Sequence, residues 1–168
     1  MLDKPMKTKM TKNIHKILIA VDGSPYSDHI IDYGVFIAKK MNSEIGVVHI
    51  NELPMAAPFT IDPLSNEPST MIMEVMQAQE DSSKELFKHI QKTWGKEIPL
   101  HIYAKVGKPK DEILATAEEF QADLIILGTH GRVGFDHFIS GSVAEGVVRK
   151  ARCPVLIIPN KDEKSDKH

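Results

Sequence analysis

Residues 122–143 read ADLIILGTHGRVGFDHFISGSV, and this stretch decides the fold that we expect. It opens with an apolar run, Leu124 to Leu127, passes through a glycine-rich segment, and ends where a helix is predicted to begin near Ser142. Between a strand and a helix, glycines let the backbone approach an anion, and the first N–H groups of the helix point toward it. The stretch therefore predicts a phosphate-binding loop.

The chain on both sides of this stretch alternates between apolar strands and amphipathic helices. Strands are predicted at 14–21, 45–50, 100–106, 122–127 and 155–158, and helices at 25–41, 71–94, from Pro109 onward, and at 142–150. Ser24 is predicted to cap the first helix and Pro25 to be its first residue. Strict alternation indicates an α/β fold, an open five-stranded parallel sheet with helices on both faces.

Ligands of such sheets bind beyond the carboxyl ends of the strands, where the strand order reverses. Asp22 directly follows the first predicted strand, and Gly128 ends the fourth. If these two strands are neighbours, Asp22 and Gly128 face the same crevice.

Length and composition limit the possible classes of protein. We expect one domain at 14–160, flexible tails at 1–13 and 161–168, and a long proline-rich loop at 51–70 within the domain.

A net charge of −2 argues against a nucleic-acid-binding protein. A single cysteine excludes an intramolecular disulfide framework. No apolar run is long enough to span a bilayer, and the first residues do not resemble a secretory signal, so we expect a cytoplasmic protein that binds no membrane.

The common nucleotide fingerprints GxxxxGK[ST] and GxGxxG are absent from the sequence. The chain has instead the pattern G-x2-G-x9-G-S, formed by Gly128, Gly131, Gly141 and Ser142. With Val21-Asp22-Gly23-Ser24, His49-Ile50 and Val106-Gly107-Lys108-Pro109, this pattern resembles the single-domain universal stress proteins over roughly 16–159. The intact glycine pattern resembles the ATP-binding branch, which implies a Rossmann-like nucleotide-binding fold with strand order 3-2-1-4-5.

The resemblance also assigns roles to individual residues. Phosphates are expected on the backbone of Gly128, Gly131, Gly141, Ser142 and Val143, with Arg132 beside them and His130 as a further contact. Asp22 is expected near the adenosine and Ile50 against the adenine, while Ala20, Val21 and Val106 complete an apolar wall. The alternatives are structural: Asp22 stabilising the first helix, Ile50 packing in the core, Arg132 lying in solvent, and Ser142 acting as an N-cap. No catalytic or metal-binding residue is assigned.

We therefore expect an ATP-dependent sensor or adaptor, with Mg²⁺ or Mn²⁺ held by the phosphates and an unidentified protein partner. No carboxylate near the loop stands out as a base, so fast hydrolysis is not expected. A slow ATPase and a nucleotide-free interaction module are the alternatives. The last predicted strand, Val155, Leu156, Ile157 and Ile158, would expose an apolar edge in a monomer, and family members commonly pair there, so a homodimer is expected.

Overall fold

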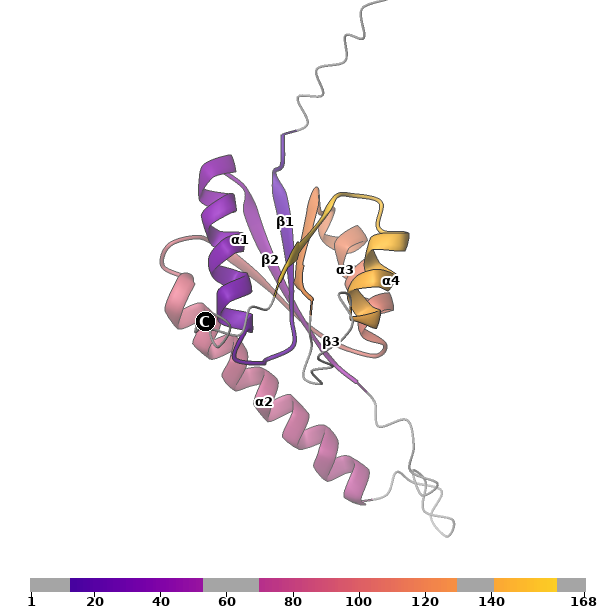
Figure 1. Ribbon diagram of the computed structural model, residues 1–168. Coiled ribbons are helices and arrows are strands. Elements are labelled where there is room, and N and C mark those ends of the chain that lie inside the picture. The colour runs from indigo at the N-terminus through magenta and orange to yellow at the C-terminus, as the bar shows by residue number, and fades with distance from the viewer. Residues whose placement is uncertain (1–12, 53–69, 130–140, 160–168) are drawn as a thin grey trace, which may run out of the picture.

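The computed structural model describes residues 13–52, 70–129 and 141–159, and the chain folds into five strands and four helices over these ranges (Figure 1). In chain order the elements are β1 (Lys16–Val21), α1 (Ser27–Met41), β2 (Glu44–Asn51), α2 (Thr70–Trp94), β3 (Leu100–Val106), α3 (Pro109–Phe120), β4 (Leu124–Gly128), α4 (Ser142–Lys150) and β5 (Val155–Ile158). Of the predicted tails and loop, residues 1–12, 53–69 and 160–168 lie outside the described residues.

All five strands are parallel, and their order in the sheet is β3-β2-β1-β4-β5. Helices α1 and α2 cover one face of the sheet, and α3 and α4 cover the other (Figure 1). The predicted fold class and strand order are both confirmed, and β3 lies at an edge of the sheet.

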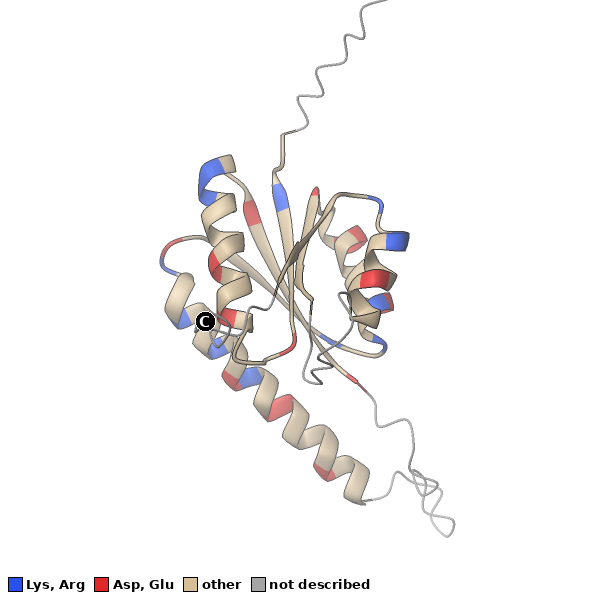
Figure 2. Cartoon of the chain, viewed as in Figure 1, with Lys and Arg blue, Asp and Glu red and all other residues tan. Residues whose placement is uncertain are grey.

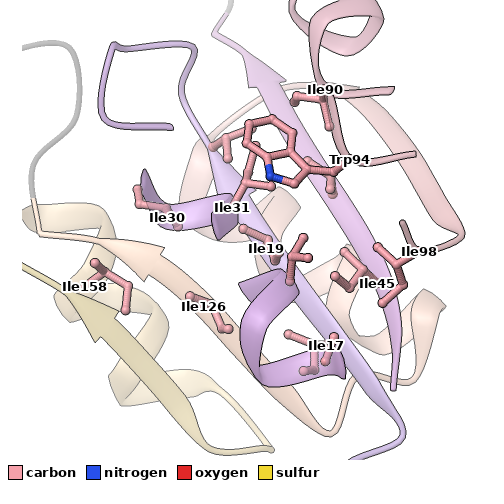
Figure 3. Close-up of a cluster of buried hydrophobic side chains, with 14 of the residues drawn as sticks. Ile17, Ile19, Ile30, Ile31, Ile45, Ile90, Trp94, Ile98, Ile126 and Ile158 are labelled. Carbon is pink, nitrogen blue, oxygen red and sulfur yellow. The ribbon is translucent and has the colours of Figure 1, made fainter. Parts of the chain in front are cut away.

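A hydrophobic core lies on each face of the sheet. The core beneath α1 and α2 is rich in isoleucine (Figure 3), and its buried members include Ile17, Ile19, Ile31, Ile45, Ile90, Trp94 and Ile126. The core beneath α3 and α4 includes Leu18, Ala20, Val48, Ile113, Phe120, Ile125, Leu127, Ala144 and Val147. Successive residues of β1 and β4 thus alternate between two buried faces, which explains why these strands are continuous apolar runs in the sequence.

The start of the first helix differs from the prediction. Helix α1 begins at Ser27 with Tyr26 as its N-cap, so neither Ser24 nor Pro25 has its predicted position. The reason is a turn built on Asp22: its Oδ1 accepts hydrogen bonds from the Ser24 N–H at 3.0 Å and from the Ser27 hydroxyl at 3.2 Å. Such an Asx turn holds Ser24 outside the helix.

The ladder between β1 and β4 ends before the strands do. Its last partners are Ile19 and Ile126, whereas β1 continues to Val21 and β4 to Gly128. By contrast, the ladder of β1 with β2 continues to the ends of β1, and that of β4 with β5 to the end of β4. The sheet is therefore unpaired along one line at its carboxyl edge, between the two strands where the strand order reverses.

Candidate functional site

The candidate site lies at the carboxyl edge of the sheet, around the unpaired ends of β1 and β4. Gly128 ends β4, Asp22 follows β1, and Ile50 lies near the end of β2. Ser142 begins α4, which packs on the same face of the sheet as α3. We call Asp22, Ile50, Gly128 and Ser142, with Ala20, the carboxyl-edge site.

Gly141 joins the start of α4 directly to the end of β4. Its N–H donates a hydrogen bond of 3.0 Å to the carbonyl oxygen of Thr129, the residue after β4. A Cβ atom at position 141 would lie 2.8 Å from that oxygen, which is closer than a side chain can approach. The backbone dihedrals, φ −57° and ψ 143°, are ordinary, so this position needs glycine for space. The close neighbour at Gly141 is thus the backbone of Thr129, and the predicted approach of an anion to Gly128 and Gly131 stays a prediction.

The first turn of α4 presents backbone donors. Gly141 is the N-cap, no side chain caps the helix, and the first intrahelical bond runs from the Glu145 N–H to the Gly141 carbonyl at 3.1 Å. The N–H groups of Ser142, Val143 and Ala144 therefore have no acceptor within the helix. Ser142 is the first helical residue and not the N-cap, so the structural alternative for this residue is wrong.

The electrostatics of this helix favour an anion at its start. The helix dipole places partial positive charge at the N-terminus. The acidic residue of the first turn, Glu145, accepts hydrogen bonds from the Arg149 guanidinium at 2.6 and 3.0 Å, one turn toward the C-terminus. Arg149 and Lys150 in the last turn complement the opposite end of the dipole.

Asp22 and Ser24 provide polar groups just after the end of β1. One carboxylate oxygen of Asp22 is committed to the turn before α1, which supports its structural alternative without excluding a second role. The Ser24 hydroxyl oxygen is buried and has no hydrogen-bond partner among the described residues. A buried hydroxyl without a partner is costly unless a ligand or water completes it.

The predicted apolar wall divides between the two faces of the sheet. Ala20 and Ile50 lie on the face covered by α3 and α4, the same face as the start of α4. Val21 packs in the opposite core. Val106 pairs with Asn51, whose side chain bonds to α2, so Val106 also faces the α2 side, and it is exposed. Only Ala20 and Ile50 can thus share one pocket through their side chains.

Three predicted contacts, His130, Gly131 and Arg132, lie outside the described residues.

A polar residue that the prediction omitted, Lys105, pairs with Ile50 across the β2–β3 ladder and shares its face. Its ammonium donates to the Glu119 carboxylate at 2.7 Å, and this hydrogen bond raises the pKa of Lys105. Residues 100–106 alternate between the two faces of a strand, and this alternation was the signal that could have placed Lys105 on the same face as Ile50. Among residues 13–52, 70–129 and 141–159, no group of three His, Cys, Asp or Glu could hold a metal ion.

Residues 13–159 match the model of the universal stress protein family. A universal stress protein of Methanocaldococcus jannaschii is 32% identical over 149 residues, covering 88% of this chain and 84% of the relative. The solved structure of the universal stress protein UspA from Lactobacillus plantarum superposes with a TM-score of 0.75 at 23% identity, covering 87% of this chain and 98% of that one. Another solved structure, of a universal stress protein in complex with cAMP, gives a TM-score of 0.54 at 20% identity, covering 87% and 97%.

The helices can also be compared with what a bilayer requires. Within the described ranges, none of them combines the length and the apolar composition of a membrane-spanning segment.

Proposed function

The chain belongs to the universal stress protein family, and from this premise we propose that it binds ATP at the carboxyl-edge site and acts as a nucleotide-dependent sensor or adaptor. The observation that carries the proposal is the set of first-turn amides of α4, which lack intrahelical acceptors beside the unpaired ends of β1 and β4. An anion is the ligand that such a helix start binds best.

Each part of an adenine nucleotide has matching groups in the proposed site. The amides of Ser142 and Val143 would bind phosphate oxygens, and Arg132, by family resemblance, would add a guanidinium. The Asp22 carboxylate and the Ser24 hydroxyl would face the ribose or the adenine edge. Ile50, with Ala20 on the same face, would offer the apolar surface for the base. The divalent cation, Mg²⁺ or Mn²⁺, would be carried by the phosphates.

The expected affinity is moderate. A hydrogen bond to a charged group contributes about 1.5–3 kcal/mol. Three or four such bonds, with the burial of the base, must offset an association cost of ~4–15 kcal/mol. We expect a net binding free energy of about −8 kcal/mol, a micromolar Kd, which lies within the range that these values allow.

Binding rather than turnover is the proposed role. The groups assigned to the phosphates are amides and a guanidinium, which bind and orient, and no side chain is assigned as a general base. The alternative of slow hydrolysis is measured by the appearance of ADP when the protein is incubated with Mg²⁺ and ATP. The other alternative, a nucleotide-free interaction module, predicts no nucleotide binding at all.

We also propose a homodimer that pairs through β5. This strand lies at the edge of the sheet, and Val155, Leu156 and Ile157 are only half-buried in one chain. Pairing of two such edges would cover these side chains. Sedimentation velocity at micromolar concentration should give the mass of a dimer, and a monomer alone would contradict this part of the proposal.

Isothermal titration with ATP, ADP, AMP and cAMP tests the proposed function. One universal stress protein has been solved in complex with cAMP, so cAMP is the most informative nucleotide to compare with ATP. We expect ATP to bind most tightly, with a micromolar Kd, because only ATP offers a triphosphate to the amides of α4. The absence of binding by ATP, ADP and AMP would reject the proposal, and a clear preference for cAMP would replace ATP as the ligand.

A further inference from the structure

Helix α2 is longer than the sheet that it covers. Figure 1 shows its N-terminal half projecting past the carboxyl edge of the sheet. The C-terminal half buries Ile90 and Trp94 in the core, whereas the projecting half exposes apolar side chains: Met71 by 72%, Met73 by 59% and Met76 by 43%. Single exposed apolar residues are ordinary, but on this half Ile72, Val75 and Met76 lie three and four residues apart along one side of the helix. Met71 and Met73 stand at the two opposite margins of that side, so the five residues form one wide apolar surface.

This surface is anchored to the domain. The Asn51 side-chain amide at the end of β2 donates to the hydroxyl of Ser83 at 2.9 Å, and Ser83 is buried. One turn earlier, the Gln79 side chain donates to the carbonyl oxygen of Glu52 at 3.1 Å. The two bonds tie the base of the projecting half to β2. The helix is therefore already formed, and a partner would not need to order it on binding.

The charge around the methionines is negative. Glu74, Glu80 and Asp81 lie on the projecting half, and Figure 2 shows acidic positions but no basic ones there. From Asn51 to Ser83 the sequence contains no lysine, arginine or histidine. The first cation is Lys84, which pairs with Glu80 at 2.8 Å and with Asp81 at 3.6 Å. A second copy of this surface would meet it with like charges, so self-pairing is disfavoured.

We propose that the projecting half of α2, residues 71–81, is a docking surface for a basic amphipathic helix of a partner protein. Methionine side chains are flexible and polarisable, so they pack against varied apolar partners. Apolar side chains of the partner at spacings of three and four residues would contact Ile72, Val75 and Met76, with Met71 and Met73 at the margins of the contact. Lysine or arginine on its flanks would face Glu74 and Glu80. The surface is about 15 Å long at 1.5 Å per residue, enough for two to three turns of such a helix.

The test uses the full chain labelled with ¹³C at its methionine methyl groups. The probe is a blocked 16-residue peptide of leucine and lysine arranged with helical spacing. Two control peptides are a scrambled one of the same composition and an analogue with glutamate in place of lysine. We expect the methyl signals of Met71, Met73 and Met76 to shift on addition of the probe, with no shift at Met41 of α1. Neither control peptide should shift them at the same concentration.

Variants locate the contact independently. The double substitution Met73→Ser and Met76→Ser should weaken probe binding by roughly tenfold or more, since a few apolar side chains carry most of the affinity of an interface. The matched control is Phe36→Ser on α1, where an equally exposed (59%) apolar side chain is removed from another surface, and binding should not change. Circular dichroism confirms the fold of each variant.

Three results would overturn the proposal. The first is the absence of methyl shifts at Met71, Met73 and Met76 in the wild-type chain at millimolar probe. The second is an equal response to the glutamate analogue or to the scrambled peptide. The third is a shift of the same signals with protein concentration alone, which would identify a second copy of the chain as the occupant. None of these results depends on whether ATP binds at the carboxyl-edge site.

Discussion

Replacing Ser142 by proline would remove one backbone N–H from the start of α4 and leave the helix in place. Ser142 is the first residue of α4, the position at which helices accept proline most readily. Gly141 before it has ψ 143°, within the range that a residue preceding proline prefers. The amide that is lost has no acceptor within the helix, so no intrahelical bond breaks.

The size of the effect follows from the assignment of that amide to a phosphate. A hydrogen bond to a charged group is worth about 1.5–3 kcal/mol. At about 1.4 kcal/mol for each factor of ten, its loss should weaken ATP binding roughly ten- to hundredfold. Proline also lowers the entropy of the unfolded chain, so the stability without nucleotide should stay equal or rise by about 0.4–1 kcal/mol.

The control is Ser142→Ala, which removes the hydroxyl and keeps the amide. Both substitutions lose the hydroxyl, so the ratio of their dissociation constants for ATP isolates the N–H. Isothermal titration measures this ratio, and thermal unfolding without nucleotide shows that the domain is intact. Equal ATP affinity for the proline and alanine variants would refute the assignment of a phosphate to the Ser142 amide.

Three other substitutions test the physical account of the domain. Gly141→Ala would press a Cβ against a backbone oxygen 2.8 Å away and should lower the free energy of unfolding by about 1–3 kcal/mol, measured by urea denaturation; an unchanged midpoint would contradict the close approach. Trp94→Phe removes the 2.8 Å hydrogen bond from the indole N–H to Asp32 and should cost about 1–2 kcal/mol in the same assay, so a variant as stable as the wild type would argue against it. Glu119→Gln should lower the pKa of Lys105 toward 10.5, because the hydrogen bond from the Lys105 ammonium to the Glu119 carboxylate raises that pKa. The stabilisation by the Lys105–Glu119 pair is present at neutral pH and is lost as the pH rises through the raised pKa of Lys105. NMR titration of the lysine side chain measures the change, and an unchanged pKa would exclude the pair.

The sequence alone predicts much of this architecture for a physical reason. A run such as Leu124 to Leu127, apolar at every position, suits a strand that buries both its faces, and β4 does so. Its alternation with amphipathic helices then requires parallel strands. The strand order came from family resemblance, since local patterns do not specify which strands pair.

The details of the carboxyl-edge site depend on tertiary geometry that local patterns do not contain. The prediction of an apolar wall from Ala20, Val21 and Val106 did not account for the alternation of side chains along a strand. Because of this alternation, Val21 and Val106 lie on the face covered by α1 and α2, opposite to Ala20. Ser24 was predicted to be a helix cap, but the carboxylate of Asp22 engages its backbone in a turn instead. The need for glycine at 141 also comes from the nearby Thr129 carbonyl oxygen, a contact that exists only in the folded chain.

The central claim is that the first amides of α4 bind the phosphates of ATP. Two-dimensional ¹H–¹⁵N NMR of the full chain tests it most directly, because it follows each backbone N–H during a titration with Mg²⁺ and ATP. We predict that the Ser142 and Val143 amide protons move downfield, as expected when an N–H donates to a phosphate oxygen, and that they saturate at the Kd found by calorimetry. Saturation of the chain with ATP while both signals stay in place would contradict the claim.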